Sequence, residues 1–129
     1  MKAITIKEPY ATLIKEGYKE YEFRTWKTSY RGDILIHSAK SYDKSNLDRF
    51  KDRNLKYNMG KIIAKATITD CIEVDEKIKK ELLDRDKEVY KNLNKKRDKP
   101  LYGFKLENIE IIDPIEVKGQ LGLWEYKEK

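Results

Sequence analysis

The residues of this chain that are best suited to chemistry lie close together, in residues 18–26 (YKEYEFRTW). Strand alternation puts Glu22, Arg24 and Trp26 on one face of this stretch. An arginine offers a planar fork for a phosphate or a base edge, an indole offers a stacking surface, and a carboxylate can anchor the arginine or accept a proton. The three side chains could therefore line a cleft that binds a nucleotide. The alternative is a Glu22–Arg24 surface ion pair beside a core tryptophan.

Three further basic residues near this stretch could contact a phosphate or a carbonyl. Lys19 could be a cation in the cleft, or it could sit at the end of the strand with its aliphatic part over the core. Arg31 precedes Gly32 in a turn, where its side chain can reach solvent and phosphate. Lys40 follows directly after a strand. We expect all three to bind nucleic acid together with the first set.

The rest of the chain offers little catalytic chemistry. It contains one His and one Cys, and it has no phosphate-binding glycine loop, dinucleotide fingerprint or metalloprotease motif. We expect Cys71, late in an apolar strand, to be a buried and inert thiol. His37 and Ser38 point to opposite faces of their strand, so one of them should face the interior. We expect neither a metal nor an organic cofactor.

The charge of the chain suits a polyanionic partner without requiring one. Lys and Arg number 29 against 23 Asp and Glu, and the formal net charge is +6. Most of the basic residues are lysines, which hold phosphates better than they read base edges. The alternative is that these lysines only keep a small protein in solution. The tract 95–97 (KKR) likewise either extends a basic track or ends a solvated helix.

Length and composition favour one domain over residues 1–129. No apolar run approaches about 18 residues, so we expect no membrane span, and no signal peptide is visible at the start. A single cysteine cannot form an internal disulfide, and a cytoplasmic location is therefore expected. The oligomeric state is left open.

The pattern of apolar residues predicts five or six strands and two or three helices. Helices are expected at 9–17, closed by Gly17, and at 75–97, where Ile78, Leu82, Val89 and Leu93 form an apolar stripe. Residues 43–53 should form a short helix or an ordered loop. Strands are expected at 2–6, 18–26, 33–39, 60–72, 101–112, 115–117 and around 123–126. This mixture predicts an α+β fold built on a small curled sheet or barrel.

The same spacing resembles the ASCH domain family, within the PUA-like superfamily. Members carry a strand, a short helix of the form P-[YW]-A-x-L-[IL], a Gly, then K-x-x-E-x-R-x-W, R-G and A-K. The chain has Pro9-Tyr10-Ala11, Leu13-Ile14, Gly17, Lys19, Glu22, Arg24, Trp26, Arg31-Gly32 and Ala39-Lys40. Residues 102–124 also resemble the closing strands of the family, whereas 41–100 lie outside the resemblance. The spacing is most similar to the ASCH domain of a eukaryotic transcription coactivator.

This resemblance implies a PUA-like bent β-barrel with flanking helices and a cleft beside the first helix. Superfamily members bind RNA or DNA and sometimes recognise a modified base. We therefore expect a module that binds nucleic acid, RNA rather than DNA, with a nucleotide or modified base in this cleft. The expected contacts are Lys19, Glu22, Arg24, Trp26, Arg31 and Lys40.

Enzymatic activity is the alternative that the resemblance raises. A small bacterial branch of the family is an amidohydrolase that acts on N4-acetylcytidine. Its catalytic lysine aligns with Lys19, but its threonine three positions later is Glu22 here. Under this alternative Lys19 and Glu22 are the catalytic candidates. A ribonuclease activity has also been proposed in the family, and a protein-interaction module with an incidental basic surface is a third hypothesis.

Overall fold

Six strands form one mixed sheet in the spatial order β2-β5-β4-β3-β1-β6. The computed structural model describes residues 1–128. The strands are β1 (Lys2–Glu8), β2 (Tyr21–Arg24), β3 (Gly32–Tyr42), β4 (Lys61–Glu73), β5 (Tyr102–Glu116) and β6 (Leu123–Glu125). The α-helices are α1 (Tyr10–Lys15), α2 (Lys44–Asp48) and α3 (Glu76–Arg85), and the 3-10 helices are η1 (Lys51–Arg53) and η2 (Lys91–Asn94).

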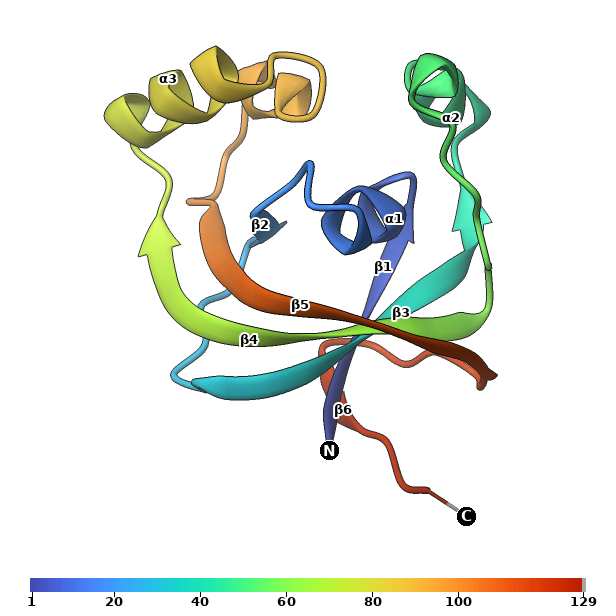
Figure 1. The fold of residues 1–129 in the computed structure, drawn as a ribbon. Coiled ribbons are helices and arrows are strands. Elements are labelled where there is room, and N and C mark those ends of the chain that lie inside the picture. Colours follow the sequence, from blue (N-terminus) through green and yellow to red (C-terminus); the bar gives the residue numbers. More distant parts are fainter. Residues whose placement is uncertain (129) are drawn as a thin grey trace.

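The sheet is bent and open. β4 and β5 curve strongly, so the sheet has a concave side, and α2 and α3 lie above its two upturned ends (Figure 1). β1 and β3 pair in parallel, and the other neighbours pair antiparallel. The strands at the two ends of the sheet, β2 and β6, do not pair with each other. The predicted α+β fold with a bent, barrel-like sheet is confirmed.

Helix α1 lies in the concave side of the sheet and is buried on two sides (Figure 1). Ala11 and Ile14 pack into the main core cluster with isoleucines of β1, β3 and β4. Leu13 packs into a second cluster with Phe50, Leu82, Val89, Tyr90 and Leu93. This second cluster fixes the segment between α3 and β5 above the first helix.

The start of α1 is held by the buried side chain of Glu8. One carboxylate oxygen accepts from the Thr12 backbone N–H at 2.8 Å, and the other accepts from the hydroxyls of Thr12 and Ser38 at 2.6 Å each. Three donors thus replace the water that this carboxylate loses on burial. At the other end Gly17 adopts φ +83°, which favours glycine, and the predicted end of the helix is confirmed.

The helix predicted over residues 75–97 is wrong in its length, because α3 ends at Arg85. Asp86 adopts an extended conformation, and its carboxylate accepts from Arg53 at 2.8 and 3.0 Å and from the Val89 N–H at 3.2 Å. A carboxylate that accepts from the N–H three residues later caps a new turn. The predicted apolar stripe still packs into one cluster, although it comes from more than one helix.

Two predicted strands also differ from the structure. The strand predicted at 18–26 is limited to β2, where the rings of Tyr21 and Phe23 lie against Gly103; a Cβ there would be 3.1 Å from the first ring and 3.2 Å from the second. The sequence predicts separate strands at 101–112 and 115–117, but the structure has one continuous strand there, β5. A bulge opposite β4 takes up residues 112–114, so the missing N–H of Pro114 costs no ladder hydrogen bond.

His37 and Ser38 are both buried, since each face of β3 is covered. Ser38 faces Glu8, as described above, and His37 lies beneath residues 117–119 and beside Trp124, with the ring centroids 5.7 Å apart. Cys71 is only half-buried, at the edge of the main core cluster, and not fully buried as expected. No helix within residues 1–128 has both the length and the apolar character that crossing a bilayer requires.

Candidate functional site

A cavity of about 510 Å³ lies where the sheet fails to close, between β1 and β2. We call it the seam cavity. Helix α1, the end of β3, the segment 89–93 and the loop before β6 complete its lining. Its polar side includes Lys19, Glu22, Arg24 and Asn92, and its apolar side includes Tyr10, Phe23, Val89, Tyr90 and Leu93.

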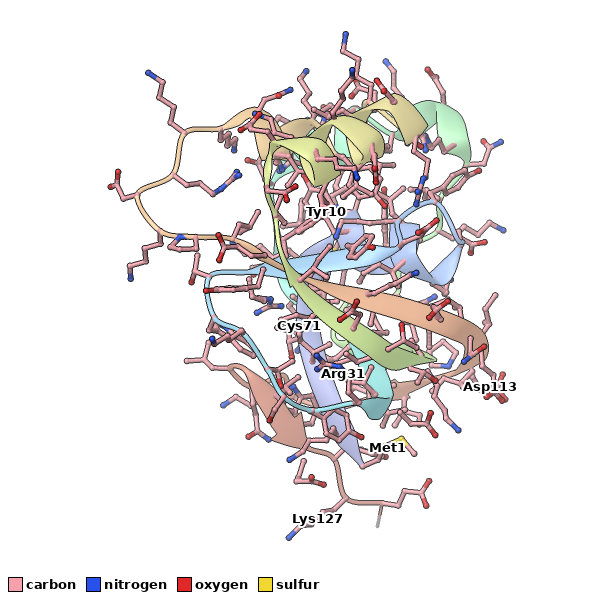
Figure 2. All side chains as sticks on the ribbon, turned by 90° about the vertical axis from the view of Figure 1, so that its left-hand side faces the viewer. Met1, Tyr10, Arg31, Cys71, Asp113 and Lys127 are labelled. Atoms are coloured by element: carbon pink, nitrogen blue, oxygen red, sulfur yellow. The ribbon has the colours of Figure 1, made fainter. Side chains whose placement is uncertain are left out.

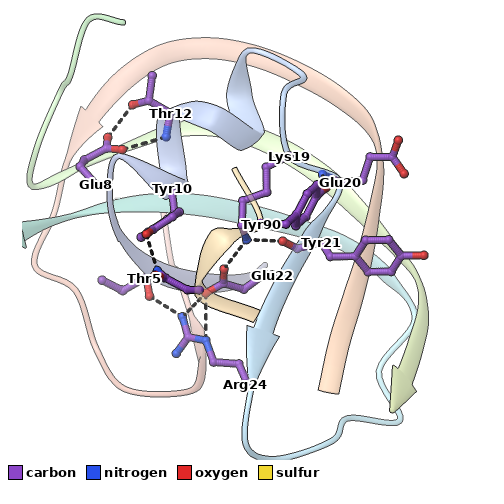
Figure 3. A network of polar contacts seen from close by, with 11 residues as sticks. Thr5, Glu8, Tyr10, Thr12, Lys19, Glu20, Tyr21, Glu22, Arg24 and Tyr90 are labelled. Carbon is purple, nitrogen blue, oxygen red and sulfur yellow. Dashed lines mark hydrogen bonds and ion pairs between the residues drawn. The ribbon is translucent and has the colours of Figure 1, made fainter. Parts of the chain in front are cut away.

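A chain of charged groups forms the polar side of the seam cavity (Figure 3). The Lys19 ammonium lies 3.3 Å from one oxygen of Glu22 and also donates to the Tyr21 backbone carbonyl. The other Glu22 oxygen accepts from Arg24 Nε at 3.0 Å and lies 2.9 Å from Arg24 Nη2. Glu22 is only 8% exposed, so two cations share one nearly buried carboxylate. Sequence analysis placed the three residues in one site, and the structure brings them together.

Arg24 connects β2 with β1, two strands that do not pair with each other in the sheet. Its Nη2 donates to the Thr5 backbone carbonyl of β1 at 2.8 Å, while Glu22 holds the other side of the guanidinium. A guanidinium has five N–H donors, and Nη1 has no acceptor among residues 1–128. The Arg24 side chain is only partly exposed. It therefore offers a fixed, charged donor at the cavity.

Lys19 is a buried cation, 5% exposed. Its ammonium lies 4.8 Å from the ring centroid of Phe23 and 5.7 Å from that of Tyr10. Burial lowers the pKa of Lys19, and the neighbouring carboxylate of Glu22 opposes that change. Lys19 lies before β2 begins, so strand alternation does not separate it from Glu22.

Two tyrosines from distant parts of the chain complete the aromatic side. The Tyr10 hydroxyl accepts from the Asn92 amide at 2.6 Å, and the Tyr90 hydroxyl accepts from the Glu20 backbone N–H at 2.9 Å. Burial raises the pKa of Tyr90 to about 12, so this side chain is neutral at physiological pH. Phe23 and Tyr90 pack edge to face with ring centroids 6.1 Å apart.

Four residues that line the seam cavity are not predicted from the sequence: Tyr10, Phe23, Tyr90 and Asn92. Tyr10 is part of the motif in the first helix, which could have identified it. Phe23 was assigned to the strand face opposite Glu22. Tyr90 and Asn92 lie in the segment that was predicted as one surface helix, and no local pattern marks them.

Three of the predicted contact residues lie outside the seam cavity. Trp26 follows the end of β2 and packs edge to face on core residue Phe104, with ring centroids 5.2 Å apart. Arg31 is exposed and donates to the backbone carbonyls of Thr28 and Tyr30. Figure 2 shows Arg31 well below Tyr10. Lys40 lines a neighbouring cavity instead.

This second cavity has a volume of about 750 Å³ and adjoins the seam cavity. The two share Thr5, Ala39, Ser41, Gln120 and Leu121 in their linings. Within residues 1–128, no three His, Cys, Asp or Glu side chains are arranged to hold a metal ion. The polar side chains that line the two cavities are cations, amides, hydroxyls, the His37 imidazole and the carboxylates of Glu22 and Glu116.

Comparison with known proteins agrees with this architecture. The fold is similar to the crystal structure of an ASCH protein from Zymomonas mobilis, with a TM-score of 0.64 and 15% identity over 98% of this chain and 87% of that one. A tyrosine-to-phenylalanine variant of that protein gives a TM-score of 0.62 and 14% identity over 98% and 90% of the two chains. No curated protein sequence matches the chain significantly. The ASCH domain family model matches residues 4–118, and the chain therefore belongs to the ASCH domain family.

Proposed function

We propose that this protein binds single-stranded nucleic acid, RNA rather than DNA, and takes one nucleotide or modified base into the seam cavity. The observation that carries this proposal is the Lys19–Glu22–Arg24 chain, which is almost buried yet lines an open cavity. Burying charged groups is costly, and a fold that only needed packing would gain from apolar residues there. Binding of a polar ligand to these charged groups would explain why they are buried at this cost.

The cavity has the two kinds of surface that a nucleobase needs. The rings of Tyr10, Phe23 and Tyr90 offer apolar faces to a flat heterocycle, and Arg24 offers N–H donors to a base carbonyl or ring nitrogen. A volume of about 510 Å³ is within the range of small-molecule sites and is large enough for one nucleoside. The proposed ligand is single-stranded because a base that is paired within a duplex cannot enter a cavity of the protein.

The net charge of +6 supports attraction to a phosphate backbone. Membership of the ASCH domain family supports RNA as the polymer, because superfamily members bind nucleic acids. A protein partner would be favoured instead if binding did not weaken with added salt, because phosphate contacts release counterions.

The experiment is a fluorescence anisotropy titration with a fluorescein-labelled single-stranded RNA of ten nucleotides. We expect Arg24→Ala to weaken binding at least about tenfold, since a charge-assisted hydrogen bond contributes on the order of 1.5–3 kcal/mol and about 1.4 kcal/mol is a factor of ten. The matched control is Arg31→Ala, which removes the same charge outside both cavities and should change the affinity less than about twofold. Arg24→Lys, which keeps the charge but not the fork, guards against loss through misfolding. Equal affinities for wild type and both Arg24 variants would reject the proposal.

A second candidate is hydrolysis of an acylated nucleoside such as N4-acetylcytidine, and one observation favours it. Lys19 is buried, lines the cavity and has a lowered pKa, as a catalytic amine requires. In this reaction water cleaves the amide bond, and the products are acetate and cytidine. Glu22, 3.3 Å from the amine, could carry the proton.

Chromatography of N4-acetylcytidine incubated with the purified protein tests this candidate. Release of cytidine that disappears in Lys19→Ala, a variant whose folding is checked by circular dichroism, would support it. Absence of release by the wild type would leave Lys19 as a structural and binding cation.

A further inference from the structure

The second cavity has a different chemical character from the seam cavity, although the two are continuous. It lacks the aromatic side chains that line its neighbour, and its charged residues are Lys40, Glu116 and Lys118. The two cavities meet at Thr5, Ala39 and Ser41, on the adjacent strands β1 and β3, beneath Gln120 and Leu121. A ligand that fills the seam cavity can therefore extend into the second one without leaving the protein surface.

Lys40 is held in place by its neighbour. Its aliphatic chain lies against Gly60, where an added Cβ would be only 2.8 Å from the Lys40 Cε. Gly60 adopts φ +77°, so this position favours glycine for its backbone as well. Neither Lys40 nor Lys118 forms an ion pair with another of the residues 1–128, so both ammonium groups are available to a ligand.

The loop between β5 and β6 supplies further donors at the same place. The Val117 N–H donates to the Gly60 carbonyl, and Leu123 is the next residue paired in the sheet, with Ile4. Within the described chain, the backbone N–H groups of residues 118–122 donate to no protein acceptor. N–H groups without a protein acceptor can donate to an anion, as successive backbone N–H groups do in anion-binding turns.

His37 explains why this loop lies so close to the sheet. Its Nε2 lies 2.7 Å from the Val117 carbonyl and donates to it, which leaves Nδ1 as an acceptor that is buried and unpartnered. A Cβ at Gly119 would be 3.0 Å from that Nδ1 and 2.8 Å from the Thr5 hydroxyl oxygen. The glycine therefore lets the loop backbone cross β1 and β3 at the junction of the two cavities, where Gln120 and Leu121 line both.

We propose that the second cavity binds the phosphate group adjoining the nucleotide whose base occupies the seam cavity. Lys40, Lys118 and the N–H groups of residues 118–122 hold this phosphate. The inference rests on the proposed function and deepens it, because it makes the binding unit a base plus a neighbouring phosphate. The base is recognised at β2 and α1, and the phosphate is recognised at β3 and the loop before β6.

The test compares two double variants by anisotropy with the same RNA over a series of KCl concentrations. The first double variant, Lys40→Gln with Lys118→Gln, removes the cations of the second cavity. The control, Lys96→Gln with Lys99→Gln, removes the same charge from an exposed loop that lines neither cavity. We expect the first pair to weaken binding about tenfold and to reduce the slope of log affinity against log salt by about 0.7, the share of one phosphate on a single strand. We expect the second pair to leave the slope within error of the wild type.

Equal effects of the two pairs, or no effect of the first, would overturn this inference while leaving the proposed function intact. An unchanged RNA affinity in Arg24→Ala would overturn the proposed function itself, so the two failures are distinguishable. A second readout uses ¹⁵N-labelled wild type: cytidine monophosphates, added as the 3′ and 5′ isomers, should shift the amide signals of Lys118 and Gly119, which line the second cavity and not the seam cavity. Cytidine without phosphate should not. Identical shifts with cytidine and both phosphates would also overturn the inference.

Discussion

Two nearly buried carboxylates flank the first helix in the sequence, Glu8 before it and Glu22 after it, and they differ in their hydrogen-bond partners. Glu8 is 1% exposed, accepts from three neutral donors and lines neither cavity. Glu22 is 8% exposed, is shared by two cations and lines the seam cavity. Neutral donors that satisfy every oxygen leave nothing for a ligand, so Glu8 serves the fold. Cations held by one carboxylate retain donors that a ligand can use, and for this reason we assign Glu22 to the proposed binding site.

The largest effect should come from removing Glu8. Glu8→Ala leaves the Thr12 N–H and the hydroxyls of Thr12 and Ser38 without their acceptor, in a buried position. We expect a loss of about 3 kcal/mol in the free energy of unfolding, measured by urea denaturation. RNA affinity at a temperature where the variant is folded should stay within about twofold of the wild type. A specific loss of RNA binding in the folded variant would remove the distinction between the two carboxylates.

Replacing Glu22 should affect stability less and binding more. Glu22→Gln keeps the shape of the side chain but removes its charge. Lys19 then lacks its counterion, and Arg24 lacks the carboxylate that orients it. We expect about 2 kcal/mol of destabilisation, since Lys19 can release its proton and thereby reduce the cost of an unpaired buried charge. RNA affinity should fall at least about tenfold. Glu20→Gln, which alters an exposed ion pair with Arg85, is the matched control.

Asp86 is a third carboxylate to compare with Glu8 and Glu22. It is bound by a cation, Arg53, as Glu22 is, but its side chain is more exposed than those of the other two. Arg53 lowers the pKa of Asp86 below its usual value, so the stabilisation is present above the unfolded pKa of about 3.9 and is lost as the pH falls through the folded pKa. Asp86→Asn should cost about 1 kcal/mol at pH 7. Its denaturation midpoint should also change less between pH 5 and pH 2 than that of the wild type. Identical acid profiles for the two proteins would contradict this assignment.

The smallest effect concerns alkaline pH and the charge of Lys19. Burial lowers the folded pKa of Lys19 below its unfolded value of about 10.4, so between these two values the unfolded chain binds more protons. Stability from this residue therefore rises with pH through that window. Urea titrations should show this rise in the wild type, a steeper rise in Glu22→Gln, and its absence in Lys19→Met. A rise that persists in Lys19→Met belongs to another group.

The sequence predicts the part of the site that is local. The first strand, the short helix, its glycine end and the triad of Lys19, Glu22 and Arg24 lie within about twenty residues, where helical and strand periodicity and the family motif apply directly. The rest depends on contacts between distant segments. Tyr90 and Asn92 reach the cavity because Asp86 interrupts a helical pattern, and the capping carboxylate that does so is recognisable only once Arg53 is placed beside it.

Trp26 shows a different limit of the pattern. Alternation puts it with Glu22 and Arg24, and its indole does pack on Phe104, the cross-strand partner of Glu22; however, Trp26 lies beyond the end of β2 at Arg24 and does not line the seam cavity. Alternation holds only while a strand is paired, and β2 pairs with no more than Tyr102–Lys105 of β5. The length of that partner contact cannot be read from residues 18–26 alone.

The most direct test of the central claim is an NMR map of the RNA site on the ¹⁵N- and ¹³C-labelled protein. On addition of the ten-nucleotide single-stranded RNA, we expect the largest shifts in the ring signals of Tyr10, Phe23 and Tyr90 and in the side-chain Nε–H signal of Arg24. Shifts confined to α3 and the basic residues 95–99, with the cavity signals unmoved, would contradict the account. Binding would then be a surface electrostatic contact, and the buried charges of the seam would belong to the fold alone.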